Sequence, residues 1–375
     1  MPRLLSRRLG TGLAVGAVSL ALLAPAGASA HGTGRHHQLA AHLVTGGLNN
    51  PRGIDVGRDG RVYVAEAGTG KVLTIKGGTV RALISGLPTA VSPEGETTGP
   101  VNVAVSSLFG RTRVVAAIGA GPQTVDARFD SVVRIRSGNA SVLADIQAYR
   151  NAHPDTTDLD QPPNPTDSNA YGLAALPFGR TLVTDAAGNE LDLIGANGRI
   201  QTVAKFPNQV VSTSHLPPGE VPAGVTELPA EAVPTSVAVG PDGWWYVGEL
   251  KGFPFTPGTS RIWRIAPWAR NVVCDPAAKR GPCTIYADGL TSVTGMAFGP
   301  DRSLYVVEIV KDGVLNLFSG GDTTGALIRI RHGKRTELVP GRLHAPGDVA
   351  VARNGRIYVT NQSVSPTSGQ VLVIR

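Results

Sequence analysis

The chain repeats a short phrase whose spacing constrains its fold more than any other feature. Two clear copies occupy residues 51–64 and 234–247, and two more occupy residues 293–306 and 346–359. Each copy reads as an apolar strand, a tight turn with Gly, in three of the four copies together with Asp, and a second strand rich in β-branched and aromatic residues. Such a β-meander cannot bury both of its faces alone, so the pattern predicts that the copies stack on one another.

Two weaker copies, at residues 99–117 and 169–185, complete a set of six. One column of residues marks the start of the first strand in each copy: Gly53, Asn102, Gly172, Ser236, Gly295 and Asp348. Subtracting successive residue numbers gives separations of 49, 70, 64, 59 and 53. Unequal periods of this size, with insertions in the loops, are typical of a propeller rather than a solenoid. We therefore expect an all-β fold, a six-bladed β-propeller.

The two ends of the chain predict how the ring closes. The last copy leaves room for one further strand at residues 370–375, whereas residues 38–45 alternate like a strand and have no blade of their own. We expect residues 38–45 to complete the last blade as its outer strand, because this pairing leaves no sheet edge open. Residues 38–375 would then form a single propeller domain.

The first thirty residues have the composition of a secretory signal peptide. Three arginines within the first eight residues precede an apolar stretch at 11–23, and Ala28-Ser29-Ala30 fits the small-x-small rule for cleavage. We expect cleavage after Ala30, a flexible linker at residues 31–37, and a secreted, extracellular protein. The mature chain would then keep no stable membrane span, and the choice between Sec and Tat export stays open.

Cysteine usage and charge limit the classes of partner. Cys274 and Cys283 are the two cysteines of the chain, and we expect them to form a disulfide because an exported protein matures in an oxidising environment. The formal charge of +7 includes three arginines of the signal peptide, so the mature chain carries 7 minus 3, or +4. No basic run accompanies this charge, so we expect no nucleic-acid partner. A monomer is expected.

A second column ends the second strand of each copy: Glu66, Ala117, Asp185, Glu249, Glu308 and Asn361. Because this strand runs antiparallel to the first, its end should lie at the same mouth of the central channel as the first column. Oxygen ligands gathered there could bind Ca²⁺. The predicted ligands are Glu66, Asp185, Glu249, Glu308, Asp348 and Asn361. In the alternative, each acid caps the loop that follows it by accepting backbone N–H groups.

The long loops fall at that same mouth, at residues 90–100, 151–170, 207–233, 250–260 and 309–325. We call this end of the propeller the long-loop face. Function concentrates on loops held by a rigid scaffold, so we predict that ligands bind here. The candidate ligand contacts are Arg52, Asn102, Ser236 and Phe253. In the alternative, the loops only cover the strand ends.

Several motifs are more specific than the strand-turn-strand phrase alone. They occupy residues 50–53, 63–68, 95–100, 185–189, 233–237 and 246–255. Through these residues the chain resembles the ScyD/ScyE family of exported β-propeller proteins, over about residues 48–374. The resemblance implies an NHL-like six-bladed propeller and export. It implies no settled activity and no catalytic residues.

Two functions follow from these features. The first is an exported binding module that holds a small molecule, a glycan or a protein on the long-loop face around the central channel. The alternative is a Ca²⁺-dependent hydrolase similar to lactonases and gluconolactonases, in which acids at the channel mouth bind the metal. His153 or His215 in the long loops could then approach as the base. No catalytic residue is assigned, no cofactor other than Ca²⁺ is expected, and whether the protein is an enzyme stays open.

Overall fold

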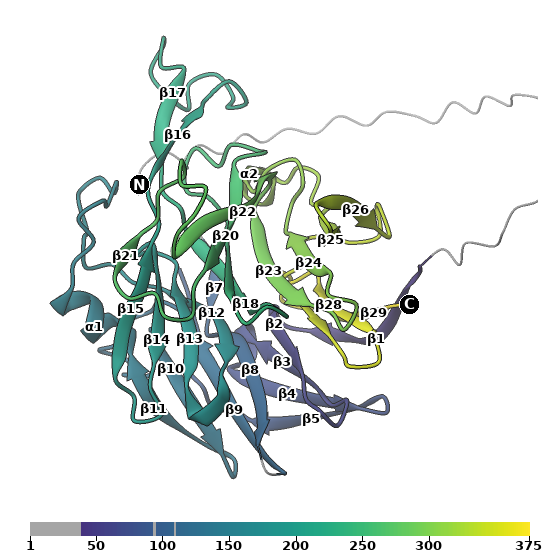
Figure 1. Ribbon diagram of the computed structural model, residues 1–375. Helices are drawn as coiled ribbons and strands as arrows, with labels where there is room; N and C mark the ends of the chain where they lie inside the picture. The colour runs from purple at the N-terminus through teal and green to yellow at the C-terminus, as the bar shows by residue number, and fades with distance from the viewer. Residues whose placement is uncertain (1–38, 93–94, 109) are drawn as a thin grey trace, which may run out of the picture.

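Six β-sheets stand around a common axis as the blades of a propeller (Figure 1). The computed structural model describes residues 39–92, 95–108 and 110–375, and the expected signal peptide and linker lie outside these ranges. Five blades have four strands and one has five. The predicted all-β, six-bladed propeller is confirmed.

The strands of each blade follow one another from the axis outward. The first blade contains β2 (Pro51–Val56), β3 (Val62–Glu66), β4 (Lys71–Lys76) and β5 (Thr79–Ile84). The second contains β8 (Pro100–Leu108), β9 (Arg111–Ile118), β10 (Ser131–Arg136) and β11 (Asn139–Asp145). The third contains β12 (Ala170–Ala175), β13 (Thr181–Asp185), β14 (Glu190–Ile194), β15 (Ile200–Lys205) and β21 (Val272–Val273).

The remaining three blades follow the same pattern. The fourth contains β18 (Pro234–Val239), β19 (Trp245–Glu249), β20 (Ser260–Ile265) and β22 (Cys283–Leu290). The fifth contains β23 (Val293–Phe298), β24 (Leu304–Glu308), β25 (Ala326–Arg331) and β26 (Lys334–Leu338). The sixth contains β27 (Val349–Val351), β28 (Ile357–Asn361), β29 (Gly369–Ile374) and β1 (Ala41–Leu48).

The N-terminal strand closes the ring as predicted. β1 pairs antiparallel with β29, and Ala41 lies opposite Ile374. The strand extends to Leu48 rather than ending near residue 45, because two register shifts carry the pairing on to Gly369. β1 therefore covers the outer edge of β29, whose backbone groups would otherwise be free to pair with another chain.

The inner strands of neighbouring blades touch along the axis. A Cβ atom added to Gly53 would lie 2.6 Å from the Cα atom of Asn102 in the next blade, and one added to Gly295 would lie 2.5 Å from the Cα atom of Asp348. Side chains do not tolerate approaches this close, so both positions require glycine. The starts of these inner strands are therefore crowded by the neighbouring blade.

The hydrophobic core lies between the blades. In one cluster, Ala65 and Val72 of the first blade pack with Val103, Ala116 and Val133 of the second. Both faces of a blade are thus buried against its neighbours, which explains why the strands read as nearly continuous apolar runs. No blade could bury these faces alone, so the stacking itself stabilises the ring.

The connections between strands carry the remaining elements. These are η1 (Ala67–Thr69), β6 (Ala90–Val91), β7 (Thr97–Thr98), α1 (Ile146–Ala152), η2 (Pro177–Gly179), β16 (Gln209–Ser212), β17 (Glu227–Ala230) and α2 (Leu315–Ser319). Figure 1 shows β16 and β17 standing out beyond the blades. None of the helices that the structure describes is long and apolar enough to cross a bilayer.

Cys274 and Cys283 form the predicted disulfide, with their Cα atoms 5.4 Å apart. The bond closes the connection from β20 to β22. Within this connection β21 pairs parallel with β15, and Val272 lies opposite Ala204. The connection between β20 and β22 of the fourth blade therefore supplies the fifth strand of the third blade. The disulfide fixes the end of that strand.

Candidate functional site

The acids of the second column bind backbone groups close to them. The Oε1 atom of Glu66 accepts a hydrogen bond from the backbone N–H of Asn49 at 2.9 Å. The Oδ1 atom of Asp185 accepts from the N–H groups of Asn169 and Gly188, both at 2.9 Å. Because Asn49 and Asn169 each precede the inner strand of the same blade, these carboxylates tie the start of a blade to the end of its second strand.

Two further members of the column make the same connection. The backbone N–H of Thr291 donates to Glu308 at 2.8 Å, and that of His344 donates to the side-chain oxygen of Asn361 at 2.8 Å. Thr291 and His344 again lie just ahead of the inner strands of their blades. Binding to backbone N–H groups ahead of the inner strands thus accounts for the shared position of these four side chains. Among them Asp185 also caps the loop that follows it, as the alternative to metal binding predicted, through the N–H of Gly188.

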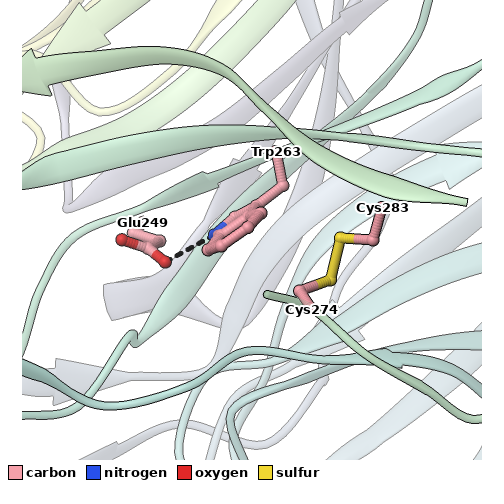
Figure 2. The surroundings of a disulfide bond; sticks show 4 residues. All are labelled: Glu249, Trp263, Cys274 and Cys283. Atoms are coloured by element: carbon pink, nitrogen blue, oxygen red, sulfur yellow. Dashed lines mark hydrogen bonds between the residues drawn. A yellow bond between two sulfur atoms is a disulfide. The ribbon is translucent and has the colours of Figure 1, made fainter. Parts of the chain in front are cut away.

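Glu249 has different partners in the fourth blade. One of its oxygens accepts from Nζ of Lys251 at 2.6 Å, and the other accepts from Nε1 of Trp263 at 2.6 Å. Figure 2 shows the Trp263 ring between Glu249 and the disulfide. All three polar groups are buried, so the pair of opposite charges satisfies both Glu249 and Lys251.

Asp348 lies between two blades instead of pointing freely into the channel. Its Oδ2 atom accepts from the backbone N–H of Ile54 at 3.1 Å, and its Oδ1 atom accepts from its neighbour Val349 at 2.8 Å. Asp55 makes the equivalent contact one blade further on, with the N–H of Val105 at 2.6 Å. Burial raises the pKa of Asp348 to about 8 and that of Asp55 to about 6.

The predicted calcium ligands are not brought together. Among residues 39–92, 95–108 and 110–375, no three His, Cys, Asp or Glu side chains form a group that could hold a metal ion. The hydrogen bonds to backbone and side-chain groups engage all six predicted ligands with other partners. A calcium site at the channel mouth stays a prediction of the sequence.

The candidate ligand contacts on the inner strands differ in how well their polar atoms are satisfied. The Asn102 side-chain oxygen accepts from the N–H of Val103 at 2.8 Å. The Ser236 hydroxyl is buried and has no hydrogen-bond partner in the described part of the chain. Arg52 is buried as well and donates from Nη2 to the carbonyl oxygen of Thr97 at 3.1 Å.

The aromatic and histidine candidates lie in the long loops. The Phe253 ring meets the Phe255 ring edge-on, with the centroids 6.0 Å apart. Nδ1 of His153 lies 2.9 Å from the carbonyl oxygen of Tyr149, and Nε2 of His215 lies 2.9 Å from that of Pro254. Each ring thus has one nitrogen engaged by the backbone.

The long-loop face is hollowed beside the third blade, where the connections that precede and follow that blade meet. The pocket has a volume of about 190 Å³. It is lined by Asp155, Asp158, Asp160, Asn164, Asp167, Asn169, Ala186, Ala187, Glu231 and Val233. Five of these residues are carboxylic acids and none is basic. We call this hollow the acidic pocket.

The sequence holds a signal for the acidic pocket that lies outside the repeat pattern. Four aspartates and two asparagines fall within the fifteen residues 155–169, which lie in a loop predicted to be long. The fifth acid, Glu231, comes from another long loop. Nothing in the local sequence pairs these two segments, because one precedes the strands of the third blade and the other follows them.

Asn189 joins the two loops of the acidic pocket. Its side-chain amide donates to Oδ2 of Asp155 at 3.1 Å and to Oε1 of Glu231 at 3.1 Å. Its side-chain oxygen accepts from the N–H of Val233 at 3.0 Å. Both loops are therefore held in place by one buried amide in the turn after β13.

Burial and mutual repulsion raise the pKa values of several acids in the pocket. Burial raises the pKa of Glu231 to about 7, with Asp160 and Asp158 adding to the effect. Burial and the neighbouring Asp158 raise the pKa of Asp160, and burial and Asp160 raise that of Asp167. Carboxylates gathered without a cation resist ionisation, so a bound cation would relieve this repulsion.

The blades and the polar long-loop face define the chain as a six-bladed β-propeller, and solved structures agree. The PQQ-bound aldose sugar dehydrogenase from Streptomyces coelicolor superimposes with a TM-score of 0.54 and 13% identity, covering 90% of this chain and 99% of that one. Two glucose dehydrogenase structures give TM-scores of 0.55 and 0.53 at 16% identity, covering 90% and 89% of this chain and 99% of each of theirs. No family model and no curated protein sequence matches the chain. At these identities the likeness shows the fold alone.

Proposed function

We propose that this protein is an exported binding module that holds an organic cation of the amine class in the acidic pocket. The observation that carries the proposal is a hollow of about 190 Å³ lined by five carboxylic acids and no basic residue. The pocket lies on the long-loop face, where the sequence predicts binding. The ligand class follows from charge complementarity.

The size and layout of the pocket favour an organic cation over a bare ion. A water molecule takes about 30 Å³ of liquid volume, so the hollow has room for several heavy atoms. Its acids come from two separate loops and surround the space from different sides. An ammonium group donates up to three hydrogen bonds, and bonds from a cation to a carboxylate are among the strongest that proteins make.

Thermal unfolding tests the proposal directly. The purified protein is titrated with spermidine and with putrescine, and NaCl of equal ionic strength serves as the reference. A ligand that binds only the folded state raises the melting temperature, by the equivalent of about 2.7 kcal/mol at one hundred times its Kd. CaCl₂ in a parallel titration tests the metal-ion alternative. Equal melting curves in amine and in NaCl would overturn the proposed function.

Two variants locate the effect. Glu231→Gln keeps an oxygen to accept from Asn189 but loses its charge, and Asp160→Asn removes a charge from the other loop. Each should weaken the amine-induced shift. Glu220→Gln is the matched control, because Glu220 is exposed in the same long connection as Glu231 and does not line the pocket. Unchanged binding by both pocket variants would place the ligand elsewhere.

Export and family are further parts of the proposal. The first thirty residues and the motifs shared with the ScyD/ScyE family support a secreted propeller of that family. N-terminal sequencing of protein collected from the culture medium would test cleavage after Ala30. The Ca²⁺-dependent hydrolase stays the second prediction, and metal-dependent lactone hydrolysis by the purified protein would support it over a binding module.

A further inference from the structure

Arg52 is a buried cation whose nearest described counter-charge is on a largely exposed side chain. Its side chain is only 8% exposed, at the long-loop end of inner strand β2. Nη2 donates to the carbonyl oxygen of Thr97, while Nε is buried and has no partner among the residues that the structure describes. The nearest described carboxylate belongs to Glu96, at 3.8 Å from Nη2, and that side chain is 64% exposed.

The other buried cations of the described chain are paired in full. Arg150 lies 3.0 Å from a carboxylate oxygen of Asp185 and 2.7 Å from one of Glu190. Lys251 lies 2.6 Å from a carboxylate oxygen of Glu249. The acid side chains in these ion pairs are as buried as their basic partners. Arg52 departs from this rule, because the one described carboxylate near it, that of Glu96, is largely exposed and 3.8 Å away. A buried charge that is poorly paired is costly to the folded state.

Other buried polar groups at the starts of inner strands are also unused. The hydroxyls of Ser236 on β18 and Thr294 on β23 are buried and have no hydrogen-bond partner within the described ranges. Closer to Arg52 is Tyr171, at the start of β12: burial raises the pKa of Tyr171, and the nearby charge of Arg52 lowers it. A buried guanidinium with an unused donor suits an anion.

We propose that the axial end of the long-loop face is a second binding site, in which the Arg52 guanidinium binds a small oxyanion, the carboxylate of an organic acid or a phosphate. Guanidinium groups pair with both through planar, charge-assisted hydrogen bonds, and Nε supplies an unused donor. The site goes beyond the proposed function, because its ligand is anionic and its position is axial rather than beside the third blade. The two sites can be tested independently.

Anion titrations of the full protein test the axial site. Succinate and inorganic phosphate are added at fixed pH, with NaCl of equal ionic strength as reference, and Kd is obtained from calorimetry and from the shift in melting temperature. We expect at least one of the two to bind, and the stronger response identifies the carboxylate or the phosphate class. Arg52→Gln should weaken binding by about 10- to 100-fold, the loss of one charged hydrogen bond.

Two variants separate the site from general charge effects. Arg113→Gln is the matched control, since Arg113 is a half-buried arginine that donates to Thr181 and has no ion pair among the described residues, yet lies away from the long-loop face. It should leave the Kd unchanged. Glu96→Gln should tighten anion binding, because it removes the nearest described negative charge from Arg52.

The stability of Arg52→Gln in the absence of anions gives a readout that does not depend on binding. If Arg52 lacks a counter-charge until a ligand arrives, the neutral variant should unfold at the same temperature as the parent protein or higher. A fall in melting temperature larger than the lost hydrogen bond to Thr97 accounts for would show that Arg52 is already paired in the folded protein. That result would overturn the proposal. So would equal anion Kd values for Arg52→Gln and the parent protein, or the absence of a response to either anion.

Discussion

Oδ2 of Asp348 accepts a hydrogen bond from the backbone N–H of Ile54 at 3.1 Å, although the two residues are 294 positions apart in the chain. The contact joins the inner strand of the last blade to that of the first. β1 makes a second connection at the outer edge of the last blade. The seam of the ring is thus fastened at both the axis and the rim, which is where an open propeller would separate.

Asp348→Ala should weaken this seam. The substitution leaves the buried N–H of Ile54 without its acceptor, and an unsatisfied buried donor costs about 1 to 3 kcal/mol. Urea unfolding at neutral pH measures the loss. Asp288→Ala is the control, because the Asp288 side chain is 77% exposed and its change should stay within about 0.5 kcal/mol. Equal losses for the two variants would contradict a role for Asp348 in closure.

Arg150→Met should be among the most damaging single substitutions. The guanidinium balances Asp185 and Glu190 in the interior, and removing one partner of a buried pair costs about 3 to 5 kcal/mol. Arg150 also donates to the carbonyl of His153 at 2.9 Å, which anchors the loop of the acidic pocket. Amine binding should therefore weaken together with stability.

A surface pair provides the comparison for Arg150. Arg128 and Asp126 form a close ion pair, but their side chains are 31% and 25% exposed. Arg128→Met should cost no more than about 1 kcal/mol, because water screens the pair in both states. Denaturant curves of the two variants should differ clearly in midpoint, and coincident curves would contradict the burial argument.

Removing the disulfide should lower stability by an amount set by its small loop. Cys274 and Cys283 are 9 positions apart, and closing a loop of this length removes unfolded-state entropy worth about 2 to 3 kcal/mol. The double variant Cys274→Ser with Cys283→Ser should show this loss in urea. Dithiothreitol should destabilise the parent protein and leave the double variant unaffected, and a response in the variant would point to another cause.

The ring was predictable because the residues that determine each blade lie close together within its own repeat. Gly53 and Gly295 stand where the next inner strand approaches too closely for a side chain. Short turns with Gly and Asp set the first hairpins of the first, fourth and fifth blades. The unpaired strand at one end and the incomplete blade at the other specify the closure by β1. These features are local in sequence, so they can be read without knowing which residues touch.

The sites were harder to predict because their partners are distant in sequence. Glu66 and Glu308 occupy the same position in the repeat, and the oxygens of both accept from backbone N–H groups just ahead of their own blades. The spacing of the repeat does not reveal these bonding partners. The acidic pocket needs Asn189 to hold Asp155 and Glu231 together, although these two acids are 76 positions apart, from 231 minus 155. Such contacts depend on how loops from different parts of the chain meet, so the repeat pattern indicated the face with the long loops but not the pocket on it.

Glu308 should make stability depend on pH. Burial raises its pKa from the usual 4.5 to about 7, while the N–H of Thr291 lowers it and nearby Glu337 raises it. The folded protein therefore holds the proton more tightly than the unfolded chain. The stability that this provides is fully present below pH 4.5 and is lost as the pH rises through 7.

Glu308→Gln isolates that contribution, because glutamine can still accept from Thr291 but does not titrate. Between about pH 5 and pH 8, the parent protein should lose about 3 kcal/mol of unfolding free energy relative to Glu308→Gln, as the shift in pKa implies. Urea unfolding of both proteins at several pH values measures the difference. Glu220→Gln, at an exposed position, should follow the parent at every pH. A proton that the native state holds more tightly makes the unfolding free energies of the parent and of Glu308→Gln diverge as the pH rises. If the two proteins instead show the same pH dependence of unfolding free energy, the buried carboxyl is already ionised in the folded ring.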